Sequence, residues 1–348
     1  MSRTTIRDIA NALGINPSTV SRALKDHPDI GKPLKEKIQA VASDLGYMPN
    51  QYASNLRSGK TFTIGLIVPE MCYFFFPSVI QAAEEMTHQY GYRLLTLHSN
   101  DRLETEAENA RILARYGVDG VLASLSRETQ NLNHFRCLTD NEIPLLFYDK
   151  IASQPNTHNI SFQNDAAVNN AVEYLMSNGK KPDRFVGFFG DEKLSISYSG
   201  ERLAAFKNAM NMHGYGVGDY DIVFADSVGE AAMKSKELFA RQDRPDACVA
   251  MGDDRLLGVS KSILQLGIRV PDEMAIISLS DGFIPGTLAF EMPYVLTSGY
   301  RMGKAATQLL FDLIEHKEIA PGISWLETPV MHTLYSGINA APNVVFEQ

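Results

Sequence analysis

The sequence predicts an α/β protein with a small helical head followed by a two-lobed core of parallel sheets flanked by helices. Helical apolar patterns joined by turn residues fill positions 5–45. From 63 to 280, strand-like apolar runs alternate strictly with helical patterns. The passage 150–163 fits neither pattern and divides the alternating set near its middle. These observations favour a head and two open sheets.

The stretch 5–24, TIRDIANALGINPSTVSRAL, predicts two short helices joined by a tight turn. Thr5 to Asp8 has the form of a capping box, and Gly14 ends the first helix. Asn16 caps the second helix, and Pro17 suits its first turn. The outer face of this second helix carries Ser18, Thr19, Ser21 and Arg22. Short polar side chains and one arginine suit a helix-turn-helix that enters the major groove; taken alone, the stretch also fits an ordinary αα-hairpin.

A third helix is expected from Pro33 to about Leu45, with an apolar stripe that completes a small core. After Pro49, a short helix at about 50–58 follows. Ala53 and Leu56 share one face of this helix, which is marginal alone. A plain tether is the alternative for this segment.

The core pattern consists of strands and helices in turn. The predicted strands are 63–69, 93–99, 120–124, 144–149, 184–190, 222–226, 247–251 and 274–280. The predicted helices are 76–90, 103–116, 128–140, 165–177, 199–213, 228–240 and 253–266. A (β/α)₈ barrel would also alternate, but the irregular passage 150–163 and the tail 321–345, with strands and no helices, favour two open sheets.

The charge is unevenly distributed. The chain of 348 residues carries −9 overall, whereas residues 1–60 hold nine Lys and Arg against five Asp and Glu, which leaves −13 for the rest. A basic head on an acidic body suits nucleic-acid contact confined to the head. The three cysteines are far apart, with no disulfide or zinc spacing, and no run of 18 apolar residues occurs. We therefore expect a cytoplasmic protein without membrane contact.

Head, linker and core together resemble the LacI/GalR family of bacterial transcription regulators. The resemblance covers the whole chain and is strongest in the stretch 5–24 and in LGYMPNQYASNLRSGKTFTIGLIVPE, with further matches in ERLAAF, RPDACVAMGDDRLLG and VPDEMAIISLSD. It implies a helix-turn-helix head with hinge helix at 1–60, and a core at 61–348 like the periplasmic sugar-binding proteins. The implied first lobe covers about 61–160 and 294–322, and the second about 163–290 and 326–345.

The resemblance implies a homodimer whose heads bind a pseudo-palindromic double-stranded DNA operator. Asn16, Pro17, Ser18 and Arg22 match the recognition positions, and Thr5, Thr19 and Ser21 are expected at phosphates. The matching hinge positions are Asn50, Ala53 and Leu56, with Leu56 wedged into a minor-groove step.

The family places a small-molecule effector between the lobes. The candidates for contact with it are Phe75, Phe76, Ser124, Asp149, Arg202, Asp226 and Asp253. Rings, an arginine fork and carboxylates suit a sugar or a similar polyhydroxylated or heterocyclic metabolite. The phenylalanines are equally compatible with a core role, and Asp149 and Asp226 with simple strand ends. Departures from the family pattern at Lys180, Gly252 and Ser280 loosen any inference about ligand identity.

An enzyme is not expected. Residues 57–61 end like a P-loop but lack its first glycine and a preceding strand, and 214–218 follow a helix instead of a strand. The eight histidines have no metal spacing, so neither metal nor cofactor is expected. The predicted function is a DNA-binding repressor whose operator affinity an effector controls allosterically; the alternative is a cytosolic metabolite sensor whose head contacts a protein partner.

Overall fold

The structure is a computed structural model that describes residues 4–47, 60–71, 74–151, 154–190, 198–218 and 221–333. The chain divides into two compact units, Met1–Thr61 and Phe62–Gln348. The expected hinge helix at about 50–58, and with it Asn50, Ala53 and Leu56, lies outside the described residues.

The first unit contains the three helices that the sequence predicts. They are α1 (Ile6–Leu13), α2 (Pro17–Leu24) and α3 (Lys32–Asp44). The carboxylate of Asp8 accepts hydrogen bonds from the backbone N–H and the hydroxyl of Thr5, and Gly14 ends α1 in the left-handed conformation. Ile9, Val20 and Ile38, one from each helix, meet in a fully buried core. Leu45, expected in the apolar stripe of the third helix, is exposed just beyond its end.

The first lobe of the core is built on a six-stranded parallel sheet in the order β11-β5-β4-β3-β1-β2. Its strands are β1 (Thr63–Val68), β2 (Arg93–His98), β3 (Gly120–Ala123), β4 (Leu145–Tyr148), β5 (His158–Phe162) and β11 (Gly322–Leu326). Its helices are α5 (Phe75–Gln89), α6 (Leu103–Tyr116), η1 (Asn133–Phe135), α7 (Arg136–Thr139) and α13 (Gly299–Ile314).

The second lobe has a six-stranded sheet in the order β12-β10-β9-β8-β6-β7, in which β12 is antiparallel to β10 and the other pairs are parallel. Its strands are β6 (Phe185–Phe189), β7 (Ile222–Phe224), β8 (Ala247–Ala250), β9 (Ala275–Ser280), β10 (Pro293–Leu296) and β12 (Val330–His332). Its helices are α8 (Asn164–Ser177), η2 (Pro182–Arg184), α9 (Tyr198–Met212), α10 (Val228–Phe239), α11 (Asp253–Leu266) and α12 (Phe283–Thr287).

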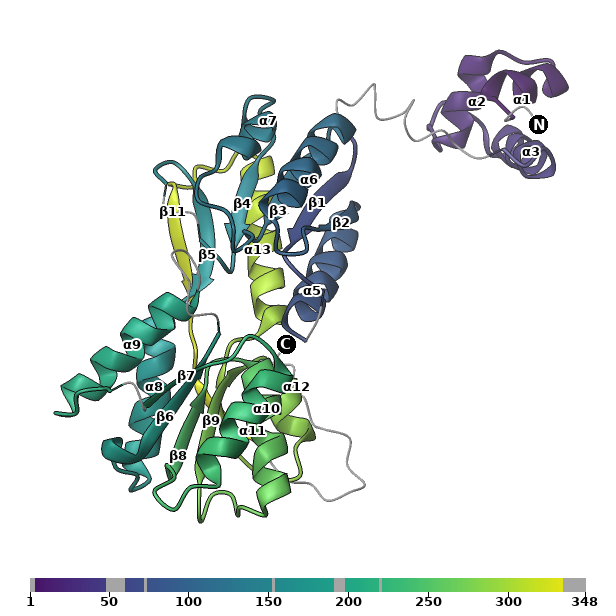
Figure 1. Ribbon diagram of the computed structural model, residues 1–348. Helices are drawn as coiled ribbons and strands as arrows, with labels where there is room; N and C mark the ends of the chain where they lie inside the picture. Colours follow the sequence, from purple (N-terminus) through teal and green to yellow (C-terminus); the bar gives the residue numbers. More distant parts are fainter. Residues whose placement is uncertain are drawn as a thin grey trace. The chain divides into compact units, whose positions relative to one another are not determined.

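Helices cover both faces of each sheet (Figure 1). In the first lobe, α5 and α13 pack on one face and α6 and α7 on the other. In the second lobe, α8 and α9 oppose α10 and α11 in the same way. Two buried faces explain why the strands are continuous apolar runs instead of alternating patterns. The predicted class, a head followed by a two-sheet core flanked by helices, is therefore confirmed.

Three details differ from the sequence predictions. The helix expected at 128–140 is wrong: the chain is irregular to residue 132 and forms only the short η1 and α7. The passage 150–163 contains β5, which pairs with β4. Strand β10 belongs to the second sheet, whereas the expected boundary at 294 assigned it to the first lobe.

The chain passes between the lobes after β5, after β10 and between β11 and β12. In the described part of the chain, no helix is long and apolar enough to cross a membrane. Among the same residues, no three His, Cys, Asp or Glu side chains are grouped so that they could hold a metal ion.

Candidate functional site

The predicted recognition positions lie on the first turns and the outer face of α2. The Oδ1 atom of Asn16 accepts hydrogen bonds from the backbone N–H of Ser18 (3.1 Å) and from its hydroxyl (2.9 Å). Asn16 and Ser18 thus cap the helix together, and Pro17 occupies its first position without a side-chain donor. Arg22 is exposed one turn later. The arginine is therefore the strongest hydrogen-bond donor on this face.

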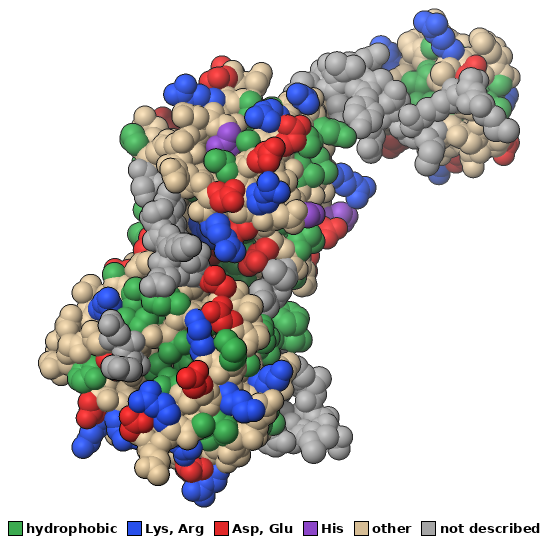
Figure 2. Space-filling view, in the orientation of Figure 1, with side chains coloured by type: hydrophobic (Ala, Val, Ile, Leu, Met, Phe, Trp, Pro, Cys, Tyr) green, Lys and Arg blue, Asp and Glu red, His purple; other side chains and the backbone are tan. Residues whose placement is uncertain are grey.

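On the side of the core seen in Figure 2, side chains of both charges are mixed. Acidic and basic side chains are interspersed over both lobes there, and no continuous basic patch is visible among the described residues. This distribution agrees with the charge of the sequence, which is positive only in the head.

In the first lobe, the effector candidates lie after the carboxyl ends of β1, β3 and β4. Phe76 is buried in the core beneath α5, while Phe75 is half-buried, with its ring edge-on to those of Phe76 and Phe162 at 5.1 and 6.2 Å. Of the two rings, Phe75 is therefore the one that a ligand can reach. Ser124 is fully buried, and its Oγ has no hydrogen-bond partner among the described residues. Asp149 is buried with a left-handed backbone (φ +64°).

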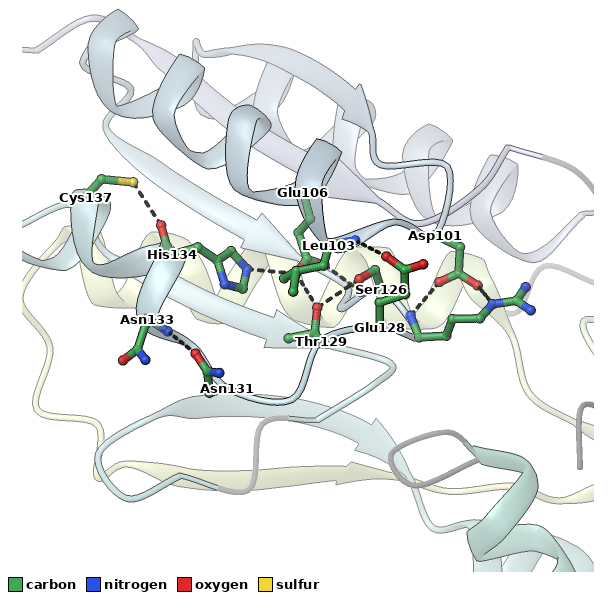
Figure 3. Close-up of polar contacts among 11 residues, drawn as sticks. Asp101, Leu103, Glu106, Ser126, Glu128, Thr129, Asn131, Asn133, His134 and Cys137 are labelled. Carbon is green, nitrogen blue, oxygen red and sulfur yellow. Dashed lines mark hydrogen bonds and ion pairs between the residues drawn. The ribbon is translucent and has the colours of Figure 1, made fainter. Parts of the chain in front are cut away.

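The loop 124–132, which follows β3, begins with Ser124 and is held in place by carboxylates. Glu106 of α6 is 0% exposed and accepts hydrogen bonds from the N–H of Ser126 (2.5 Å) and the hydroxyl of Thr129 (2.5 Å). Its Oε1 also lies 2.8 Å from Nε2 of His134. Figure 3 shows these side chains converging beneath the loop.

Two further carboxylates fix the same loop. Asp101 accepts hydrogen bonds from the backbone N–H (2.7 Å) and Nε (2.5 Å) of Arg127, and Lys150 pairs with it at 3.2 Å. Glu128 accepts a hydrogen bond from the N–H of Leu103 at the start of α6 (Figure 3). Burial raises the pKa of Asp101, but the Lys150 charge and the Arg127 hydrogen bonds outweigh it and leave the pKa lowered.

In the second lobe, Arg202 of α9 is held in place by two acceptors. Its Nε donates to Oδ1 of Asn164 (2.9 Å), and its Nη1 donates to the carbonyl of Met251 (3.0 Å). Asn164, which the sequence analysis missed, is buried at the first position of α8, directly after the crossing from β5. The sequence position of Asn164, directly after a strand, could have marked it as a candidate, because ligands of open sheets bind at the carboxyl ends of strands. Asp226, by contrast, is exposed where α10 begins.

Asp253 and Asp281 form an acidic pair at the carboxyl edge of the second sheet. The hydroxyl of Ser280 donates to Oδ1 of Asp253. Burial raises the pKa of Asp253 to about 7, and the nearby Asp281 and Asp254 carboxylates add to this shift, against the Ser280 hydrogen bond. Burial also raises the pKa of Asp281 to about 6.

Asp281, a second residue that the sequence analysis missed, links the two lobes. One carboxylate oxygen accepts from the N–H of Gly299 at the start of α13 (2.6 Å), and the other lies 3.5 Å from the hydroxyl of Ser78 on α5. Beside it, the rings of Phe74 and Phe283 stack with centroids 3.8 Å apart and planes 20° apart. These contacts join the second lobe to the helix N-termini of the first.

Two family models match parts of the chain. The model described as "Bacterial regulatory proteins, lacI family" matches residues 5–50, and "Periplasmic binding protein-like domain" matches residues 172–331. The HTH-type transcriptional regulator RegA of Clostridium saccharobutylicum is 26% identical over 319 residues, which cover 91% of this chain and 94% of that protein. The HTH-type transcriptional repressor PurR of Vibrio vulnificus (strain CMCP6) is 28% identical over 330 residues, which cover 90% and 93%.

Solved structures show the same fold. The lac repressor dimer bound to operator and the anti-inducer ONPF has a TM-score of 0.82 at 18% identity, with 94% of this chain and 98% of that chain covered. A complex of the transcriptional regulator CelR with cellobiose has a TM-score of 0.68 at 21% identity and the same coverage.

Proposed function

Because this chain belongs to the lacI family of bacterial regulatory proteins, we propose that it is a repressor whose head binds a pseudo-palindromic DNA operator and whose core senses a metabolite. As a family member it is a transcription regulator with a ligand-binding core, and not an enzyme.

The proposal that the head binds DNA is supported mainly by α2, which has one buried apolar face and one outward polar face. Val20 and Ala23 are buried against the other two helices, so the opposite face with Ser18, Thr19 and Arg22 is turned outward. Arg22 is the residue that we propose for a guanine edge, because its fork matches O6 and N7. Thr5, Thr19 and Ser21 are proposed at phosphates, where hydroxyls suffice. Asn16 and Pro17 set the approach of the helix.

For the segment that precedes the core, we retain the proposal that Asn50, Ala53 and Leu56 belong to a hinge helix. Leu56 from each of two protomers would insert into the central minor-groove step and kink the operator. We likewise propose a homodimer with a head at 1–60 and a core from 61.

The effector is proposed to bind at the facing carboxyl ends of the two sheets, where ligands of open α/β sheets bind. Arg202, immobilised by Asn164 and Met251, supplies a pre-oriented fork, and Phe75 supplies a ring. Ser124, Asp149, Asp226 and Asp253 complete the proposed set. A sugar or sugar derivative fits hydroxyl-binding carboxylates beside an arginine.

We propose that the effector acts by changing the relation between the lobes. It would alter the contacts around Asp281 and the Phe74–Phe283 stack, and thereby the spacing of the two heads on DNA. The CelR–cellobiose complex supports a saccharide as the type of ligand, because a protein of the same fold was solved with one.

A thermal shift screen of the purified full-length chain tests the effector part. Sugars, sugar phosphates, nucleosides and purines are added singly; a specific ligand at ~100 times its Kd stabilises the folded state by roughly 2.7 kcal/mol. The shift should vanish in Arg202→Ala and persist in Arg301→Ala, a matched change at an exposed position of α13. An equal shift in both variants would contradict the proposed site.

Salt dependence tests the DNA part against the alternative of a protein-binding head. The logarithm of the association constant for duplex DNA should fall linearly with the logarithm of the salt concentration, with a slope of about −0.9 per phosphate contact. A chain that binds no duplex from a random pool at low salt would refute DNA binding and leave the protein-partner alternative.

A further inference from the structure

The loop 25–31, which joins α2 to α3, folds back over the end of α2. The N–H of His27 donates to the carbonyl of Arg22 (3.0 Å), and the N–H of Ile30 donates to the carbonyl of His27 (3.2 Å). Asp26 has a left-handed backbone (φ +54°) within this turn. The loop carries two exposed carboxylates, Asp26 and Asp29, that lie three residues apart and face different helices.

Asp26 faces α3. Its Oδ1 lies 2.6 Å from Nζ of Lys35, whose side chain is only 16% exposed. The Lys35 hydrogen bond and charge lower the pKa of Asp26. This pair ties the loop to the body of the head and does not involve the recognition face.

Asp29 faces α2 instead. Its Oδ2 lies 4.0 Å from Nη1 of Arg22 and 3.4 Å from Nδ1 of His27, and its N–H donates to the same ring nitrogen (3.4 Å). The side chains of Arg22 and Asp29 are 61% and 66% exposed. Exposed ion pairs contribute little to folding. We therefore relate the contact between Asp29 and Arg22 to the proposed base contact of Arg22, and not to the stability of the head.

Arg22 stands out because the neighbouring candidates are engaged in the helix cap. The Oδ1 of Asn16 and the hydroxyl of Ser18 bond to each other, and Pro17 has no side-chain donor. Discrimination between bases then depends strongly on one long, flexible cation. An arginine without a partner would bind any phosphate, and phosphate contacts carry no sequence information.

We propose that Asp29 is a positioning residue that sets the sequence specificity of Arg22. Its carboxylate offsets the attraction of the guanidinium to phosphate and restricts its rotamers, which leaves the outer edge of the fork for the O6 and N7 atoms of a guanine. Asp29 itself contacts no base. The inference rests on the proposed function, in which the head binds DNA and Arg22 contacts a base.

The test is an in vitro selection from a random duplex pool with the full-length chain, followed by titrations of the selected and a random duplex at several salt concentrations. Asp29→Asn is compared with Asp26→Asn, which removes the same charge from the same loop but leaves Arg22 paired. Arg22→Ala and the double variant Arg22→Ala/Asp29→Asn complete a cycle. Unchanged thermal midpoints show that each head is folded.

For Asp29→Asn we expect about tenfold less discrimination at one G·C pair of the selected site, the pair that Arg22→Ala also affects. The log–log salt slope for random DNA should steepen by about 0.9, because the released Arg22 gains a phosphate. Asp26→Asn should keep the base preference. In the Arg22→Ala background, the further change Asp29→Asn should leave the base preference unchanged. The single variant Asp29→Glu keeps the negative charge and should therefore retain part of the base preference that Asp29→Asn loses.

Four outcomes overturn the inference. The first is an Asp29→Asn variant that behaves like the parent. The second is an Asp26→Asn variant that loses as much discrimination, which reduces the effect to net charge. The third is a loss of preference in Asp29→Asn at a base pair that Arg22→Ala leaves unaffected, which would make Asp29 itself a base contact. Failure of the parent chain to enrich any sequence overturns the proposed function together with the inference; enrichment by the parent keeps the two failures distinct.

Discussion

Replacement of Asp253 by asparagine should make the ligand-free core less sensitive to pH. The carboxyl of Asp253 lies at the start of α11, where burial and the Asp281 and Asp254 carboxylates raise its pKa from 3.8 to about 7. Ionisation is therefore unfavourable in the folded chain, whereas in the unfolded chain the group ionises near its ordinary pKa. Asparagine has nearly the same shape and cannot ionise.

The sign follows from proton linkage. Between pH 4 and 7 the folded state binds more protons at Asp253 than the unfolded state, so the free energy of unfolding falls as pH rises through this window. A shift of about three pKa units, at about 1.4 kcal/mol each, costs the parent up to about 4 kcal/mol at pH 8. The cost disappears only below the unfolded-state pKa of 3.8, and at pH 4.5 it is already about 1 kcal/mol. Asparagine also weakens the Ser280 hydrogen bond. The part of this bond that depends on ionisation is already contained in the raised pKa of Asp253, so only the remaining, pH-independent loss cancels in the comparison.

The assay is urea unfolding of the parent and Asp253→Asn at pH 4.5 and 8, followed by the fluorescence of Trp325, the single tryptophan, which lies in β11 of the core. The variant should gain about 3–4 kcal/mol relative to the parent on going from the lower to the higher pH. Asp272→Asn, at an exposed turn, serves as the control and should show no such gain. An equal effect of Asp253→Asn at both pH values would refute the reasoning.

Two further predictions concern the stability of the core. Glu106→Ala should destabilise the core by about 3–5 kcal/mol in the same assay, because buried partners such as the N–H of Ser126 lose their acceptor; a loss below about 1 kcal/mol would contradict this. Gly303→Ala should cost about 1–3 kcal/mol, because its Cβ would lie 2.4 Å from the carbonyl of Val79 where α13 crosses α5. Gly229→Ala, a helical glycine whose nearest contact would be at 3.9 Å, should be neutral or slightly stabilising, and equal losses at both glycines would show that α5 can move away.

Periodicity was sufficient for most of the fold because the elements that it marks are buried on the expected faces. It failed at 128–140, where the helical pattern is overridden from outside the segment: Glu106 and Asp101, distant in sequence, hold the backbone at 126–129 in an irregular path. Hydrogen bonds of this kind depend on the assembled lobe and leave no local signal.

Two other features that the sequence predictions lack, a helix and a carboxylate, do have a visible pattern in the sequence. The helix 299–314 shows apolar residues at helical spacing, and the structure buries them beneath the first sheet. Asp281 directly follows a buried strand, the position where functional carboxylates of open sheets lie. The engagement of Asn16 with Ser18 could be inferred only in part, because a cap position predicts the backbone contact and not the hydroxyl contact.

The pairing of β11 with β5 has a consequence for the order in which the protein can fold on the ribosome. Gly322 is registered with His158, and α13, which begins at 299, supplies much of the apolar cover beneath the first sheet. The head and the second sheet up to β10 can be completed as they emerge. The first lobe, although most of it is synthesised earlier, remains without its edge strand and one covering helix until residue 326 has left the exit tunnel. During translation the β5 edge is thus open to wrong pairing until β11 has been added.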